Sequence, residues 1–365
     1  MLEQEKTLLN VFEQMAQYGH EQVIFNYDKA TGLKAIIAIH DTTLGPALGG
    51  CRMWDYETEQ AALTDALRLS RGMTYKCAVS GARHGGGKTV ILGDPKTEKS
   101  DELFQALGTF IETLKGRYYT GTDVGTVGMD FVSAGKQTKC VVGLPEEYGG
   151  SGNSAIITAF GVYHGMKATA KEAFGTDSLG DLTIAVQGLG KVGYDLLGRL
   201  YQDGVKLIVT DISEENVRRA KEAYPNIMTV KPDEIFSVEC DIFSPNALGA
   251  IINDETIPQL QCKAICGAAN NQLHETRHGV MLKEKGILFA PDYVANAGGL
   301  IQVADELQGY HKERAFKNAG LIYDILLKIY AIAKKENIAT SLAAEIMLDN
   351  RIETIGRIQR KLTAR

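Results

Sequence analysis

The sequence predicts an α/β fold of two domains with a cleft between them, and three observations lead to that prediction. The chain has 365 residues, more than a single hydrophobic core usually includes. From residue 155 onward, short apolar runs typical of strands alternate with helical patterns, as in a parallel, doubly wound sheet. Pro145 and four glycines over 143–152 interrupt any regular element, so we place a hinge or loop there. The predicted domains span 1–145 and 146–335, and a C-terminal helix over 336–365 packs back on the first.

The elements of the first domain follow from its hydrophobic periodicity. Helices are predicted where apolar residues recur at helical spacing, over 1–19, 58–76 and the segment from Phe104 to Leu114. Strands are predicted for the apolar or β-branched runs 21–27, 33–40, 89–92 and 118–124. These elements form a mixed α/β domain.

The second domain is expected to begin with a helix over 155–174. Its strands are predicted over 182–187, 205–211, 241–244, 264–267 and 287–290, each followed by a helical stretch. The last ~70 residues have few helix breakers and are predicted to be long helices.

Composition excludes several classes of function. The net charge is −6 with a pI near 5.7, and basic residues are scattered among acids, so nucleic acid is not an expected partner. No apolar run approaches the ~20 residues of a membrane helix, and the N-terminus does not resemble a signal peptide. Six widely spaced cysteines without a CxxC pair favour reduced, buried thiols and a cytoplasmic protein. We identify no set of metal ligands.

A glycine-rich loop follows the predicted strand 182–187. The loop has the sequence Gly188-Leu-Gly190-Lys191-Val192-Gly193 and precedes a helical pattern. In a Rossmann-type domain, the first glycine permits a tight turn, the second lets the backbone approach a pyrophosphate, and the third allows close helix packing. Asp211 closes the next strand 18 residues after Gly193, where an acid meets ribose hydroxyls and repels a 2′-phosphate. The pattern predicts NAD rather than NADP.

A second glycine-rich segment contains Gly85, two further glycines and Lys88. It lacks the spacing of a P-loop and leads into a strand, so we expect no nucleotide triphosphate site here. Lys76 lies twelve residues before Lys88 at the end of a predicted helix. Of two neighbouring ammonium groups, one can bind a carboxylate and the other, with a lowered pKa, can be a base. Asp123, at the end of a strand, is a candidate proton shuttle.

Together these segments resemble the glutamate/leucine/phenylalanine/valine dehydrogenase family. The motifs that carry the resemblance are 45–53, 72–76, 85–88, 119–123, the glycine-rich loop and 296–306. The resemblance implies an N-terminal substrate-binding and oligomerisation domain, a Rossmann-type NAD domain, and a homo-oligomer, commonly an octamer. It also implies reversible oxidative deamination of an L-amino acid to a 2-oxo acid and ammonia.

The resemblance further implies roles for individual residues. Lys76 binds the substrate carboxylate, Lys88 activates the water that attacks the imino carbon, and Asp123 exchanges a proton with the amino group. Thr158 contacts the nicotinamide amide, and Asn270 and Asn271 lie where the nicotinamide and the substrate amine meet. The resemblance also assigns Gly49 and Gly50 to the substrate and Lys191, Val192, Asn246, Ala268 and Asn296 to the cofactor.

Substrate preference is predicted from two local patterns. Gly121-Thr-Asp123 and Gly298-Gly-Leu300-Ile-Gln302 follow the phenylalanine type, whereas leucine dehydrogenases usually carry Ala-Glu-Asp and Gly-Gly-Val-Ile-Asn. We expect Gly121 to make room for a ring beside Leu300, with Leu48, Met73 and Val303 completing an apolar wall. L-Phenylalanine is therefore the expected substrate, leucine or another branched-chain amino acid is the alternative, and a non-catalytic NAD-binding regulatory protein is a third hypothesis.

Arg83 and His84 depart from the Asp-Phe that phenylalanine-type relatives usually carry before the three glycines. We expect the added positive charge to lower the pKa of Lys88 further.

Overall fold

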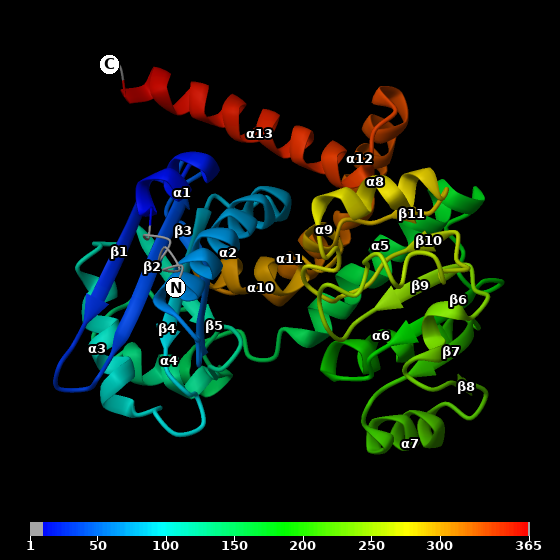
Figure 1. Ribbon diagram of the computed structural model, residues 1–365, viewed down its shortest axis with the longest axis horizontal. Helices are drawn as coiled ribbons and strands as arrows, with labels where there is room; N and C mark the ends of the chain where they lie inside the picture. Colours follow the sequence, from blue (N-terminus) through cyan, green and yellow to red (C-terminus); the bar gives the residue numbers. More distant parts are fainter. Residues whose placement is uncertain (1–9, 364–365) are drawn as a thin grey trace, which may run out of the picture.

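The computed structural model describes residues 10–363, which form two α/β domains as predicted (Figure 1). The first domain, blue to cyan in Figure 1, lies beside the green and yellow second domain, and α10 and α11 lie between them. Residues 1–9, the first part of the predicted N-terminal helix, lie outside the described residues. That helix is present from Val11 to Tyr18 as α1.

A five-stranded sheet with the order β1-β2-β4-β3-β5 forms the centre of the first domain. Its strands are β1 (Gln22–Tyr27), β2 (Lys34–Asp41), β3 (Ala47–Trp54), β4 (Gly85–Leu92) and β5 (Tyr118–Thr122). The strands β3, β4 and β5 run parallel, whereas β1 and β2 are antiparallel to their neighbours. The helices are α2 (Glu59–Ser80), α3 (Asp101–Glu112) and α4 (Gly128–Ala134).

The two faces of this sheet bury alternate residues of the same strands, as the period of a strand requires. Ile36 of β2 packs with Leu63 of α2. Its neighbour Ile37 packs with Phe104 of α3 and Phe131 of α4 on the opposite face. The helix α2 begins where Thr58 accepts a hydrogen bond from the Ala61 amide, so an N-cap explains its start.

Two features of this sheet differ from the sequence prediction. The strand β3 was not predicted, because Gly49 and Gly50 at its centre are depleted in strands. The strand β4 begins at Gly85 and not at Thr89, so the three glycines belong to the sheet and do not form a loop. Both differences concern glycines that lie where elements approach closely.

The second domain contains a parallel six-stranded sheet with the order β11-β10-β9-β6-β7-β8. Its strands are β6 (Thr183–Gln187), β7 (Lys206–Thr210), β8 (Met228–Thr229), β9 (Ile242–Pro245), β10 (Ala264–Ile265) and β11 (Leu288–Phe289). The helices around it are α5 (Ala155–Phe174), α6 (Lys191–Gln202), α7 (Glu214–Ala223) and α8 (Thr276–Glu284). The strand order reverses between β6 and β9, where ligands of open α/β sheets bind at the carboxyl ends of the strands.

The last segment of the chain is helical, as predicted. It comprises α9 (Asp292–Ala295), α10 (Gly298–Glu306), α11 (Lys312–Gly320), α12 (Ile322–Glu336) and α13 (Thr340–Thr363). The helix α13, red in Figure 1, extends back over the first domain and contacts α2, where Arg71 lies 3.8 Å from Glu345. Within residues 10–363, no helix is long and apolar enough to cross a membrane. All six cysteines are free and buried.

The helix α10 forms hydrogen bonds with the segment that connects the two domains. The two carboxylate oxygens of Glu306 accept hydrogen bonds from the backbone amides of Gly143 at 2.8 Å and Ser151 at 2.7 Å. The Ser151 hydroxyl also donates to Glu306. The Gln302 amide donates to the Ser151 carbonyl at 2.8 Å. A helix that follows the second sheet thus holds both ends of the connecting segment.

Candidate active site

Gly86, the second of the three glycines of β4, lets α2 lie directly on the strand. A Cβ atom at Gly86 would lie 2.1 Å from the Thr74 hydroxyl and 2.5 Å from the Ser70 carbonyl, both in α2. A Cβ at Gly87 would lie 2.7 Å from the Tyr118 ring. A side chain at Gly86 would push α2 away from the sheet, whereas one at Gly87 would collide with Tyr118. Gly86 therefore brings the end of α2, with Lys76, close to β4, with Lys88.

Lys88 and Asp123 form an ion pair across β3 in which Lys88 is buried and Asp123 is partly exposed. Lys88 Nζ lies 2.6 Å from Asp123 Oδ2, and Lys88 is 5% exposed. Strand pairing aligns Leu48 with Gly86 and Cys51 with Thr89, which places Gly50 beside Lys88. A Cβ at Gly50 would lie 2.9 Å from the Asp123 Cβ. Glycine at position 50 therefore keeps the space in which the two side chains meet.

The carboxylate of Asp123 is ionised despite its partial burial. Burial alone would raise its pKa, but the Lys88 ammonium and the Arg52 guanidinium together hold the pKa below its usual value. Arg52 Nε lies 3.3 Å from Asp123 Oδ2. Sequence reasoning missed Arg52, although it lies in one of the motifs that carry the resemblance.

Lys76 is half-buried at the junction of the two domains. Burial lowers its pKa to about 8, with Asp292 opposing and Lys88 adding to this effect. Its Nζ donates to Asn270 Oδ1 at 3.4 Å, a contact from α2 to the loop after β10. Lys76 is thus a cation that part of the protein population loses in mildly alkaline solution.

Asp292 was also missed by sequence reasoning. It is the first residue of α9, and its Oδ2 accepts a hydrogen bond from the Asn271 amide at 2.6 Å. Asn271 has a φ of +51°, a conformation that needs such local support outside glycine. Asn296 donates to Asn270 Oδ1 at 2.7 Å. The three asparagines, Asp292 and Lys76 are therefore one connected group.

An apolar cluster lies at the same junction. We call it the domain-junction cluster; it includes Leu48, Met73, Cys77, Val142, Leu300 and Val303. The structure thus brings together the four predicted wall residues Leu48, Met73, Leu300 and Val303.

Gly121 does not leave the open space that was expected. A Cβ there would lie 2.7 Å from the Val142 carbonyl and 3.2 Å from its side chain. The position is filled by Val142 and not by a space for an aromatic ring, so the size argument from Gly121 is wrong. Val142 could not be found from the sequence, because it lies just before the connecting segment and outside every predicted element.

The glycine-rich loop has the geometry of a dinucleotide site. Gly188 has a φ of +92° and forms the turn after β6, and a Cβ at Gly193 would lie 2.0 Å from the Gly188 carbonyl. A Cβ at Gly190 would meet nothing within 4 Å. Space beside the backbone is therefore available at the second glycine, where a pyrophosphate approaches. The helix α6 starts at Lys191 without a side-chain cap, so its first amides are free for an anion.

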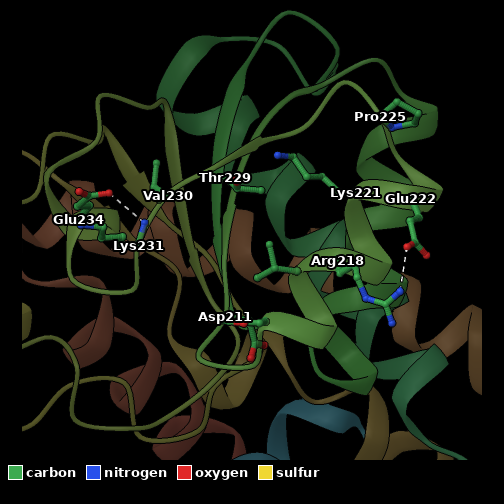
Figure 2. A pocket seen from close by; sticks show the side chains of 11 residues that line it. Asp211, Arg218, Lys221, Glu222, Pro225, Thr229, Val230, Lys231 and Glu234 are labelled. Atoms are coloured by element: carbon green, nitrogen blue, oxygen red, sulfur yellow. Dashed lines mark hydrogen bonds and ion pairs between the residues drawn. The ribbon is translucent and has the colours of Figure 1, made fainter.

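Asp211 lies beside this loop at the end of β7. Its Oδ2 accepts from the Leu189 amide at 2.6 Å, and its Oδ1 accepts from the Ser213 amide at 2.8 Å. Figure 2 shows Asp211 at the edge of a groove between α7 and the segment after β8. In this groove Arg218 is paired with Glu222. An acid here fits a ribose diol and opposes a 2′-phosphate.

The other residues assigned to the cofactor lie around the carboxyl edge of the same sheet. Asn246 Oδ1 accepts from the Ala268 amide at 2.9 Å and joins the ends of β9 and β10. Thr158, in the first turn of α5, lies against Gly299, where a Cβ would be 2.8 Å from its hydroxyl. Asn296 Oδ1 is buried and, within the described residues, has no hydrogen-bond partner. A buried acceptor without a donor fits a bound ligand amide, so the residues present fit NAD.

His84 does not add a charge beside Lys88 at neutral pH, contrary to expectation. Burial lowers its pKa, although its Nδ1 lies 3.3 Å from the Pro46 carbonyl. Its ring packs edge-on against Tyr119.

The arrangement brings together the half-buried Lys76, the Lys88–Asp123 ion pair, an apolar cluster and a glycine-rich loop with the geometry of a dinucleotide site. Residues 20–142 match the model of the Glu/Leu/Phe/Val dehydrogenase dimerisation domain, and 149–321 match that of glutamate/leucine/phenylalanine/valine dehydrogenase.

Similar proteins span nearly the whole chain. A leucine dehydrogenase of Geobacillus stearothermophilus is 57% identical over 347 residues, 95% of this chain and 94% of that protein. A phenylalanine dehydrogenase of Caldalkalibacillus thermarum is 52% identical over 351 residues, 95% and 94% of the two chains. The crystal structure of L-tryptophan dehydrogenase from Nostoc punctiforme superposes with a TM-score of 0.85 at 46% identity, covering 95% of this chain and 99% of that one. The chain therefore belongs to the glutamate/leucine/phenylalanine/valine dehydrogenase family of amino-acid dehydrogenases.

Proposed function

We propose that this protein is an NAD-dependent dehydrogenase that reversibly deaminates an apolar L-amino acid, with leucine as the preferred substrate. The observation that carries the proposal is the position of Lys76, Lys88 and Asp123 beside the domain-junction cluster. Identity supports leucine over the phenylalanine expected from the sequence, since leucine dehydrogenases match at 54–57% and phenylalanine dehydrogenases at 51–53%. The filled space at Gly121 removes the size argument for a ring.

In this proposal each side chain has one task. The Lys76 ammonium binds the substrate carboxylate and so fixes the α-carbon near Asn270. Asp123 accepts a proton from the substrate ammonium, which leaves the amine free to become an imine. Lys88, once deprotonated, takes a proton from the water that attacks the imino carbon. NAD, when bound, supplies the acceptor for the α-hydride.

The cluster and the loop account for the two selectivities. The six side chains that define the cluster are apolar, so they favour a branched alkyl side chain over the carboxylate of glutamate. Asp211 favours NAD over NADP, because its carboxylate would repel a 2′-phosphate.

Steady-state kinetics test the proposal. NADH formation is measured with L-leucine, L-isoleucine, L-valine, L-phenylalanine and L-glutamate, and with NADP in place of NAD. We expect the highest kcat/KM for leucine and the lowest for glutamate. A higher kcat/KM for phenylalanine would instead support phenylalanine as the substrate. The Gly121-Thr-Asp123 pattern and Leu300 favour that second candidate. NAD binding without turnover of any amino acid would support the regulatory hypothesis instead.

The assembly and the compartment are part of the same proposal. We expect a homo-oligomer, because residues 20–142 match a dimerisation domain. The resemblance to the family suggests that this oligomer is an octamer. Light scattering of the purified protein measures this mass directly. We place the protein in the cytoplasm, since its six cysteines are free and buried.

A further inference from the structure

Arg52 connects Asp123 to a second carboxylate that lies outside the catalytic group. Arg52 lies on β3, its Nε is 3.3 Å from Asp123 Oδ2, and its Nη1 is 2.7 Å from Asp65 Oδ2 on α2. The Tyr56 hydroxyl donates to the same Asp65 oxygen at 2.6 Å. Arg52 is therefore held from both sides, and its side chain is only 22% exposed.

Both cations that contact Asp123 bind one of its oxygens. Lys88 Nζ and Arg52 Nε each lie at Oδ2, and no side chain of residues 10–358 donates to Oδ1, whereas the Val124 backbone also donates a hydrogen bond to this carboxylate. Lys88 and Arg52 thus orient the carboxylate through Oδ2, and Oδ1 is the oxygen that can accept a proton from the substrate. The titratable and charged groups that act on Asp123 from the surrounding elements are Lys88 on β4, Arg52 and Cys51 on β3, and Lys76 on α2.

The two cations differ in one chemical respect. Lys88 must lose its proton when it acts as a base, and Asp123 then loses that counter-charge while it remains partly buried. A partly buried carboxylate without a counter-charge takes up a proton more easily. Arg52 cannot lose its proton, because a guanidinium stays charged at every pH at which proteins are stable.

We infer that Arg52 is a positioning residue that, fixed by Asp65 and Tyr56, keeps Asp123 ionised and oriented while Lys88 changes its protonation state. The inference rests on the proposed function, because it assigns Arg52 a task in the same reaction. Arg52 makes the ionisation of Asp123 independent of the protonation state of Lys88. Without Arg52, deprotonation of Lys88 and protonation of Asp123 would occur together, and neither group would be ready for its own step.

The test is the pH profile of kcat for Arg52→Gln with the preferred amino acid. Loss of the guanidinium raises the pKa of Asp123, and the acidic limb of the profile moves to higher pH. We expect a shift of about one pH unit or more, the usual effect of one neighbouring arginine. Turnover should then fall about tenfold at the pH where the wild-type limb lies, and recover at higher pH. Arg52→Lys should restore part of the shift.

Arg68→Gln is the matched control. Arg68 also approaches Asp65, at 3.9 Å, but its side chain is 67% exposed and, within the described residues, it makes no ion pair with Asp123. Its acidic limb should coincide with that of the wild type. If Arg52→Gln does not fold, Tyr56→Phe removes only the hydroxyl that holds Asp65 and should give a smaller shift of the same sign.

The outcomes separate the inference from the proposed function. An inactive but folded wild-type protein would refute the proposed function. An active wild type with an unmoved acidic limb in folded Arg52→Gln, or in Tyr56→Phe if that is the variant available, would refute the role of Arg52 alone. A uniform loss of kcat at all pH values, together with a lowered melting temperature, would show a merely structural role and overturn the inference as well.

Discussion

Affinity for a 2-oxo acid should fall steeply above pH 8 if Lys76 binds the substrate carboxylate. Burial lowers the pKa of Lys76 to about 8, so the ammonium is about nine-tenths populated at pH 7 and about one-tenth at pH 9. Only the protonated form attracts a carboxylate. Each pH unit above the pKa should therefore weaken binding about tenfold, or about 1.4 kcal/mol.

Calorimetric titration of the 2-oxo acid into the protein with NADH, without ammonia, measures this effect. The 2-oxo acid is chosen because, unlike the amino acid, it does not titrate between pH 7 and pH 10. Lys76→Met should bind the 2-oxo acid roughly 10- to 100-fold more weakly at pH 7, the range of a charge-assisted hydrogen bond.

Two further variants separate the charge from the shape of the side chain. Lys76→Arg keeps a cation at all these pH values, so its affinity should stay flat from pH 7 to pH 9.5. Lys88→Met removes a cation that lowers the pKa of Lys76, so the fall in affinity should begin at higher pH. A flat wild-type affinity over this range would refute the assignment of Lys76.

Three other predictions concern the loop, the cofactor and folding. Gly190→Ala should fold with an unchanged melting temperature, because its Cβ meets no protein atom within 4 Å. It should lose NAD affinity at least tenfold in a fluorescence titration, whereas Gly72→Ala, equally open in α2, should retain it. Asp211→Asn should lower the ratio of kcat/KM for NAD to that for NADP about tenfold or more; an unchanged ratio would exclude Asp211 from the ribose site. Burial, with His40 adding, lowers the pKa of His20 from 6.5 to about 4, so the unfolded chain takes up a proton before the folded one. Stability should be complete above pH 6.5 and should fall as the pH drops towards 4, by at most about 3 kcal/mol. Urea unfolding of His20→Gln at pH 7 and pH 5 should show a smaller difference than the wild type.

Most of the second domain was predictable because its signals are local. A strand, a glycine-rich loop and a helix follow each other in the chain, and the structure has β6, the loop and α6 at those positions. In the first domain, β3 was missed because glycine usually argues against a strand. Gly49 is required there by contact with β4, where a Cβ would lie 1.7 Å from the Gly87 carbonyl. This steric requirement arises from tertiary packing, so no local sequence pattern could reveal it.

The residues proposed for catalysis were identified from the sequence, but the residues that contact them were not. Lys88 and Asp123 stood out by residue type and by the resemblance. Arg52 contacts Asp123 across 71 residues of sequence, and Asp292 contacts Asn271 across 21. Contacts at such separations follow from strand order and loop geometry, which hydrophobic periodicity does not determine.

The hydrogen bonds between α10 and the interdomain connection affect how the substrate range of such a protein can diversify. Leu300 and Val303 lie on the helix whose Gln302 and Glu306 hold that connection, whereas Lys76, Lys88 and Asp123 belong to the first domain. Under the proposed function, substitutions at Leu300 and Val303 can therefore reshape the space for a substrate side chain without changing the positions of Lys76, Lys88 and Asp123. Selection can act on what is accepted and on how it is converted as two separate traits.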